Sequence, residues 1–120
     1  MKVIHVDSNK FVLDAMRDEL HQIVPDAELH CFELPDSALA FAEAQRCEVL
    51  LTEIELWADR LGGIRLAKAM REINPGVRII FVTVCSEHEV AGELSGLPVS
   101  GFLTKPWDSS QLAEMLSNLR

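Results

Sequence analysis

Short apolar runs alternate with segments of helical spacing along this chain of 120 residues. The apolar runs have the length of β-strands, and the run at 79–82 is apolar at every position, as in a strand buried on both faces. Such strands require helices on both sides of the sheet, which indicates a parallel sheet. The predicted strands are 3–6, 27–32, 49–52, 77–84 and 101–104. The predicted helices are 11–24, 37–45, 64–73, 87–94 and a last one striped from 112 to 119.

Polar and helix-breaking residues mark the ends of these elements. Pro25 follows the first helical stripe, and the residue before a proline disfavours the helical region. Asp36 is predicted to cap the second helix, and Asp108 with Gln111 forms a predicted capping pair for the last one. Neither repeats nor low-complexity segments interrupt the alternation. We therefore expect one doubly wound α/β domain over residues 1–120.

Charge, cysteine content and hydropathy exclude several classes of function. Nineteen acidic residues against eleven basic ones give a formal charge of −8, which argues against binding to a nucleic-acid backbone. The three cysteines lack CxxC spacing, so neither a disulfide framework nor a structural zinc site is predicted. No apolar stretch approaches the ~20 residues that a membrane span needs. The sequence predicts a soluble, cytoplasmic protein that does not associate with membranes.

Polar side chains follow four of the predicted strands. In doubly wound folds, ligands bind outside the carboxyl ends of the strands. The residues at those ends are two carboxylates, two hydroxyl groups and one lysine: Asp7, Ser8, Glu53, Thr83 and Lys105. Any one of them could simply terminate a buried strand, but together they predict a functional cluster at one edge of the sheet.

These residues and their neighbours resemble the receiver domain of bacterial two-component response regulators, of the chemotaxis-regulator type. The resemblance covers essentially the whole chain. It implies a flavodoxin-like fold with strand order 2-1-3-4-5. Its most specific motif is the lysine–proline step at the end of the last strand. The segments that carry the resemblance are Val6-Asp7, the stretch 48–56, Phe81-Val82-Thr83 and Gly101-Phe102-Leu103-Thr104-Lys105-Pro106.

The resemblance implies a role for each residue that matches a family position. Receivers usually hold Mg²⁺ with two adjacent acidic residues after the first strand, the acceptor carboxylate and one backbone carbonyl. The implied equivalents are Asp7 and Ser8 for the acidic pair, Glu53 for the phosphoacceptor, the carbonyl of Glu55 for the metal site, Thr83 for the hydroxyl that contacts the phosphoryl group, Phe102 for the aromatic switch residue, Lys105 for the lysine that pairs with the acceptor, and Pro106 for a proline after a cis peptide bond.

Two of the matches depart from the family pattern at the positions that matter most for chemistry. Ser8 replaces a carboxylate, so one anionic ligand for a hard cation is missing. Glu53 is one methylene longer than the usual acceptor aspartate, and a displacement of about an ångström at a reacting centre can cost ~10²-fold in rate. The segment 57–63 is also about two residues longer than the usual loop, with Trp57 where proline is expected. We expect weak Mg²⁺ binding or none, and no other cofactor.

Glu53 admits two interpretations. Its longer side chain reaches toward the place that a phosphoaspartate would fill, where it could contact Lys105 and Thr83 directly. Glu53 would then act as a built-in phosphate mimic. Alternatively, Glu53 is a decayed acceptor without signalling content.

The sequence therefore predicts an atypical, phosphorylation-independent receiver that is not an enzyme and acts through protein–protein contacts. The expected partners are a sensor histidine kinase or another signalling protein, or a second copy bound through the face formed by 87–94, 101–104 and the last helix. Because no output domain is predicted, its effect would pass through a partner, or the domain would belong to a longer regulator. Two alternatives stay open: a receiver that is still phosphorylated, and an α/β domain that binds a small ligand.

Overall fold

The computed structural model describes residues 1–119, and within them a single sheet of five parallel strands forms the centre of the molecule. The strand order is β2-β1-β3-β4-β5, which confirms the predicted parallel sheet and its topology. The strands are β1 (Lys2–Val6), β2 (Glu28–Phe32), β3 (Val49–Thr52), β4 (Arg78–Thr83) and β5 (Gly101–Thr104).

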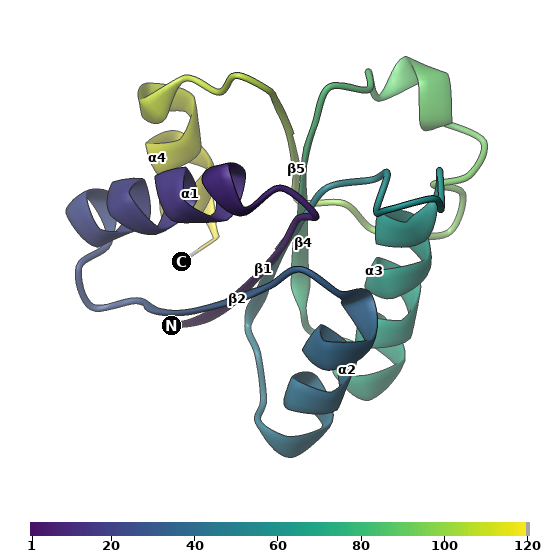
Figure 1. Ribbon diagram of the computed structural model, residues 1–120, viewed down its shortest axis with the longest axis horizontal. Coiled ribbons are helices and arrows are strands. Elements are labelled where there is room, and N and C mark those ends of the chain that lie inside the picture. Colours follow the sequence, from purple (N-terminus) through teal and green to yellow (C-terminus); the bar gives the residue numbers. More distant parts are fainter. Residues whose placement is uncertain (120) are drawn as a thin grey trace.

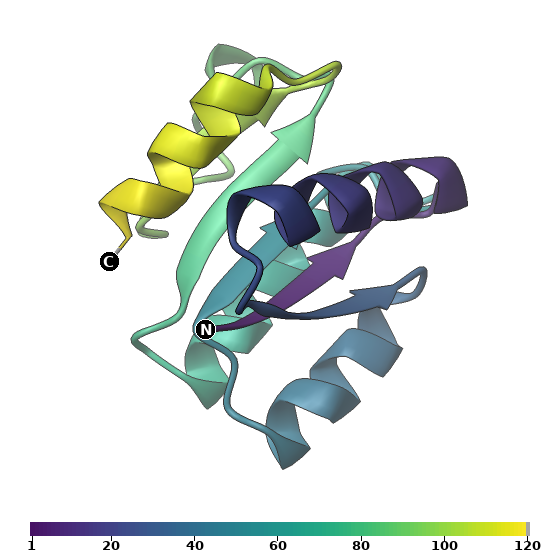
Figure 2. The same cartoon turned by 90° about the vertical axis from the view of Figure 1, so that its left-hand side faces the viewer.

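Helices cover both faces of the sheet, as the doubly buried strands require. Figure 1 shows α1 and α4 on one side and α2 and α3 on the other. Figure 2 shows α1 and α4 lying side by side across the near face of the strands. The helices are α1 (Lys10–Ile23), α2 (Pro35–Ala44), α3 (Gly62–Ile73) and α4 (Ser109–Asn118).

The sheet separates two hydrophobic clusters. One lies under α2 and α3 and includes Ile4, Leu50 and Phe81, while the other lies under α1 and α4 and includes Val3 and Leu51. Successive residues of β1 and β3 thus point to opposite clusters, because side chains alternate across a strand. All five of these side chains are fully buried. The two clusters therefore fix how each strand is oriented in the sheet. The candidate site lies where these strands end.

Helix starts follow the sequence in one case and differ from it in another. The Asp108 carboxylate accepts hydrogen bonds from the backbone amides of Ser110 and Gln111, which confirms it as the cap of α4. The prediction that Asp36 caps the second helix is wrong, because α2 begins at Pro35 and places Asp36 inside its first turn. A proline at the first helical position needs no amide partner, so the helix starts there without a side-chain cap.

The predicted helix over 87–94 is also wrong. Only a 3₁₀ turn, His88–Val90, forms there, and the rest of the segment between β4 and β5 consists of turns and bends. Ser86 and Glu89 do exchange the backbone–side-chain hydrogen bonds of a capping box. Gly92 follows within one turn and has low helix propensity, so the helix does not continue beyond this turn. Within residues 1–119 there are thus four α-helices rather than the predicted five.

No helix in the described part of the chain is both long and apolar enough to cross a membrane.

Candidate functional site

The carboxyl ends of four strands bring the predicted residues together. Asp7 directly follows β1, Glu53 follows β3, Thr83 ends β4 and Lys105 follows β5. In the sheet register Val6 pairs with Thr52, Thr52 with Phe81 and Thr83 with Thr104. The residues after these strands therefore emerge at the same edge of the sheet. Of the five residues predicted to cluster, the structure brings Asp7, Glu53 and Lys105 into direct contact at this edge.

Lys105 lies between the two carboxylates. Its ammonium nitrogen Nζ is 2.6 Å from Oδ2 of Asp7 and 2.9 Å from Oε1 of Glu53. Only 17% of the lysine side chain is exposed to solvent, against 1% for Asp7 and 9% for Glu53. The peptide bond between Lys105 and Pro106 is cis, as the resemblance predicted. The three charged groups carry a net charge of −1 and form a compact, largely buried cluster.

The remaining oxygens of both carboxylates accept hydrogen bonds from the backbone. Oδ1 of Asp7 accepts from the amide of Asn9 at 2.8 Å, and Oε2 of Glu53 accepts from the amide of Ile54 at 2.6 Å. Every carboxylate oxygen of the pair therefore has a hydrogen-bond partner before any ligand is added. Buried carboxylates need such partners, because an uncompensated buried charge is costly.

The protonation of Lys105 is decided by two opposing effects. Burial by itself lowers the pKa of Lys105, because it disfavours the charged ammonium. Hydrogen bonds and charge attraction from Asp7 and Glu53 outweigh the burial, and the pKa of Lys105 is raised above its ordinary value. The lysine therefore stays charged through the neutral range and holds the two acids together.

Thr83 and Phe102 make their own contacts outside this cluster. The Thr83 hydroxyl accepts a hydrogen bond from the Cys85 amide at 3.1 Å. No hydrogen bond joins it to Glu53 in the described structure, so of the two contacts considered for Glu53 the one with Lys105 forms and the one with Thr83 does not. A threonine hydroxyl commonly accepts a hydrogen bond from the backbone amide two residues further along the chain. The Thr83 oxygen makes this local bond and not one to Glu53. Phe102 is partly buried and packs against Phe81, with ring centroids 5.6 Å apart.

The long loop between β3 and α3 is braced from two sides. Leu56 and Asp59 exchange backbone hydrogen bonds in a tight turn, which holds Trp57 at a φ of 56°. Few non-glycine residues adopt this left-handed conformation. The indole nitrogen of Trp57 donates to the carbonyl of Glu33 at 2.8 Å, which ties the loop to the segment after β2. The loop is thus held by specific contacts at the position where the family has proline.

Gly63 is required where this loop enters α3. Its amide donates to the carbonyl of Ile54 at 2.7 Å. A Cβ atom at this position would lie 1.8 Å from the backbone oxygen of Glu53, which is closer than any real contact. Only glycine lets the start of α3 pack this tightly against the loop that carries Glu53.

A cavity of about 260 Å³ opens above the ion pair. Ser8, Glu55 and Cys85 contribute to its wall, so the predicted Ser8 and Glu55 also belong to this place. Trp57 and Val84 stand on the rim with exposed side chains. Within residues 1–119, no group of three or more His, Cys, Asp or Glu side chains is arranged to hold a metal ion.

Two partners in the site escaped the sequence analysis. The backbone amide of Ile54 binds Glu53, but a main-chain donor leaves no mark in the residue pattern. The Trp57–Glu33 bond joins loops that are 24 residues apart, and only the folded sheet brings them together. Asn9 could be predicted in part, because the polar residues Asp-Ser-Asn after the first strand are typical of a helix cap. Its side chain caps α1 through the Phe11 amide.

Comparisons with known proteins agree with this geometry. A family profile described as "Response regulator receiver domain" matches residues 3–117. A cyclic di-GMP phosphodiesterase response regulator, RpfG of Xanthomonas campestris, is 24% identical over 121 residues. That match covers 99% of this chain but only 32% of the relative, so the chain spans about a third of that protein's length.

Solved structures show the same fold at low sequence identity. The Vibrio cholerae chemotaxis protein CheY4 superposes with a TM-score of 0.85 at 21% identity, covering 99% of this chain and 98% of that one. The N-terminal domain of a three-domain response regulator/sensory box/GGDEF protein from Carboxydothermus hydrogenoformans gives 0.85 at 18% identity, with 99% and 93% covered.

Proposed function

Because this chain belongs to the family of response regulator receiver domains, we propose that it is a receiver that signals without phosphorylation, with Glu53 replacing the acceptor aspartate. Receiver domains serve two-component signal transduction, are generally not enzymes, and interact with histidine kinases and effector domains. Glu53 acts as a built-in mimic of the phosphorylated acceptor. We propose that residues 1–120 form the receiver domain and that this domain works by protein–protein interaction.

The contact between Glu53 and Lys105 carries this proposal. In the family the corresponding lysine pairs with the acceptor, and here its ammonium is 2.9 Å from the glutamate oxygen and 2.6 Å from Asp7. The longer glutamate side chain supplies this bond without any added group. A charge-assisted bond of this kind stabilises a buried arrangement by ~1–3 kcal/mol when its geometry is good. In this proposal Thr83, Phe102 and Pro106 keep their family positions around the pair as switch and phosphate-contact equivalents.

The donor set does not fit the Mg²⁺ ion that receiver domains typically bind at the acceptor site. Asp7, Glu53 and the backbone carbonyl of Glu55 are the candidate ligands. Both carboxylates are already bound to the Lys105 ammonium, and Ser8 replaces the second acid. A divalent cation here would have to displace the lysine from two short contacts. We therefore propose weak Mg²⁺ binding at most, and no step of the function depends on it.

Exposed apolar side chains around the cavity support a protein partner. Trp57 and Val84 on the rim are 55% and 71% exposed, and Phe11 at the start of α1 is 84% exposed and lines a neighbouring hollow that also includes Lys105. Exposed apolar groups gathered near a site are typical of interaction surfaces. We propose a signalling protein, such as a sensor histidine kinase, as partner in the cytoplasm, and the face formed by 87–94, β5 and α4 as the place where two copies would pair.

Substitution of Glu53 tests the mimic. Glu53→Gln removes the charge that binds Lys105, and Glu53→Asp withdraws the carboxylate by one methylene. We expect both to shift the amide resonances around Lys105 and Phe102 and to change the dimer fraction in sedimentation. Glu55→Gln is the matched control, because it removes an exposed carboxylate two residues away and leaves the bonds of Lys105 unchanged.

The mimic is refuted if both Glu53 variants keep the wild-type dimer fraction and the wild-type resonances outside residue 53 and its chain neighbours. Glu53 would then be a decayed acceptor. A change that appears equally in Glu55→Gln would also count against it, because it would reflect net charge rather than the bond to Lys105.

A further inference from the structure

A second cavity lies at the opposite end of the sheet from the Glu53–Lys105 site. It has a volume of about 560 Å³, within the range of about 300–1,000 Å³ that is typical of small-molecule sites. One wall is the last turns of α3 and the other is the loop that leads into β5. The lining residues are Lys68, Arg71, Glu72, Pro75, Ser95, Gly96 and Leu97. Because Pro75 precedes β4 and Leu97 precedes β5, the cavity lies toward the amino ends of these strands.

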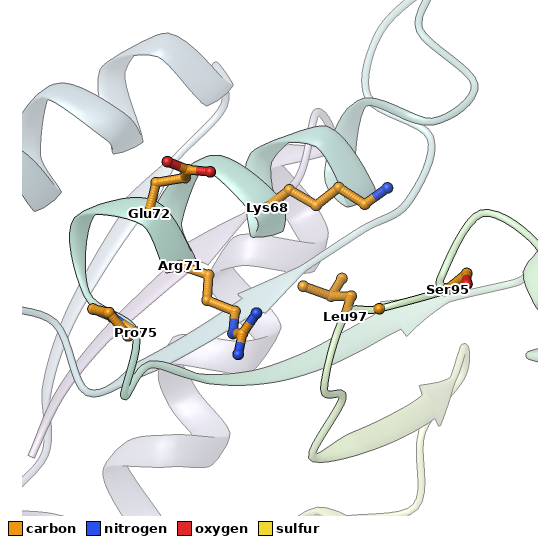
Figure 3. A pocket seen from close by; sticks show the side chains of 7 residues that line it. Lys68, Arg71, Glu72, Pro75, Ser95 and Leu97 are labelled. Atoms are coloured by element: carbon orange, nitrogen blue, oxygen red, sulfur yellow. The ribbon is translucent and has the colours of Figure 1, made fainter.

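Two cationic side chains enter this cavity from α3. Figure 3 shows the Arg71 guanidinium and the Lys68 side chain directed toward the loop of Ser95 and Leu97, while Glu72 points away from the guanidinium. Positions 68 and 71 are one helical turn apart, so both side chains stand on the same face. The helix α3 therefore places two positive charges on one side of the cavity.

Neither cation is neutralised within the described chain. Lys68 and Arg71 form no ion pair among residues 1–119, whereas Lys2, Arg60, Arg65 and Lys105 each contact a carboxylate. The Nε atom of Arg71 is shielded from solvent and has no hydrogen-bond partner in the described structure. A buried N–H donor without an acceptor is rare in proteins and calls for an explanation, such as a bound water or ion. The terminal nitrogens of the guanidinium also form no hydrogen bond within residues 1–119, and an oxyanion in the cavity would bind them.

The opposite wall supplies apolar surface and a fixed shape. Leu97 is buried against the core cluster under α3, and Pro75 lines the cavity from the turn that follows α3. Gly96 has a φ of +80°, which lets the loop turn at this point. A ligand here therefore meets the two cationic side chains of α3 and the apolar surface of Leu97 and Pro75. The Glu72 carboxylate at the edge and the net charge of −8 disfavour anions of high charge.

We propose that this cavity binds a small organic oxyanion, a carboxylate or a phosphate monoester attached to an apolar body. Arg71 and Lys68 bind the oxyanion, and Leu97 with Pro75 contacts the apolar part. The planar guanidinium fork matches the oxygens of carboxylate and phosphate equally well, so both chemistries belong to the proposal. The site shares no residue with the cavity at Glu53 and Lys105.

Binding of four probes to the full chain tests this site. The probes are benzoate, phenyl phosphate, inorganic phosphate and neutral benzyl alcohol, titrated while the backbone amide resonances are recorded. We expect saturable shifts at Gly96 and Leu97 with benzoate or phenyl phosphate, and much weaker ones with the other two. The stronger of the first two probes identifies the anionic group.

Charge-removing variants locate the binding. Arg71→Gln should weaken the binding about tenfold or more, because it removes the charge-assisted bonds to the anion. Lys68→Gln alters an exposed position and should weaken binding without affecting the fold. Lys10→Gln on α1 is the matched control and should bind as the wild type does.

Three results would overturn the proposal. The first is no saturable binding of either aromatic anion. The second is binding that survives both Lys68→Gln and Arg71→Gln. The third is equal binding of inorganic phosphate, which would exclude a role for the apolar wall.

Discussion

Removing the charge of Lys105 tests the electrostatics of the site most severely. In Lys105→Met the hydrocarbon stem remains, but Asp7 and Glu53 face each other as two buried carboxylates without a cation. At an effective dielectric constant of about 20, each contact of 2.6 and 2.9 Å is worth about 6 kcal/mol of gross attraction. Desolvation of the three groups offsets much of this attraction. Breaking a buried pair by removing one partner costs about 3–5 kcal/mol net.

That loss is large beside the stability of the whole domain. A chain of this size is stabilised by about 5–15 kcal/mol, so Lys105→Met should lower the urea midpoint clearly. The double variant Glu53→Gln/Lys105→Met removes one of the two repelling carboxylates. We expect it to be more stable than Lys105→Met alone, although it carries one more substitution. The assay is urea unfolding followed by circular dichroism at pH 7, at equal protein concentration.

Acid should rescue the single variant. Without the ammonium, each buried carboxylate binds a proton more readily in the folded than in the unfolded chain, so the stability of Lys105→Met rises relative to wild type as the pH falls. Arg65→Met is the matched control, because its partner Asp59 lies on the surface and the pair is exposed. We expect little change there. A small loss in Lys105→Met, with no gain from the second substitution, would refute the buried ion pair.

Three further predictions follow from burial and packing. Gly63→Ala should cost at least about 3 kcal/mol, because its methyl group would meet a backbone oxygen at 1.8 Å, whereas Gly92→Ala has free space and should be nearly neutral in the same denaturation assay. Burial, with a smaller contribution from the charge of Lys105, lowers the pKa of His5 to about 3, so protonation of the unfolded chain should cost the wild type about 2 kcal/mol between pH 7 and 5. His5→Leu should remove that part of the pH dependence, and an unchanged slope would contradict the buried neutral imidazole. Burial also raises the pKa of Cys47 to about 11, so iodoacetamide at pH 8 should label Cys47 only after unfolding, whereas the partly exposed Cys85 reacts in the native protein. Labelling of native Cys47 would contradict its burial and would show that the segment just before β3 opens locally.

The sequence predicted the sheet and the place of the site because both depend on simple periodicity. Doubly apolar runs identified the parallel strands, and the polar residues that end them had to meet at one edge. The predicted helix over 87–94 does not form for a local reason, since the capping box at Ser86 and Glu89 is followed by Gly92 before a second turn can form. Propensity decides such a short segment, and no packed helical stripe outweighs it.

The detailed bonding of the site could not be derived from the sequence. The length of the Glu53 side chain predicted that it reaches Lys105. That the Thr83 hydroxyl binds the Cys85 amide and not Glu53 depends on the backbone geometry at the strand end. The cavity between α3 and the loop at Ser95 likewise depends on how that irregular segment packs. In the sequence alone, Lys68 and Arg71 are indistinguishable from charged residues on a solvated helix face. Only the fold shows that they line a cavity.

The central claim is that Glu53 holds Lys105 itself and makes phosphorylation unnecessary. The most direct measurement is intact-mass spectrometry of the protein with acetyl phosphate and Mg²⁺, combined with amide spectra under the same conditions and with beryllofluoride. The account predicts no added phosphoryl group and no shifts around Asp7, Glu53 and Lys105. A stable phosphoryl adduct together with shifts at these residues would contradict it and would show a receiver that is still phosphorylated.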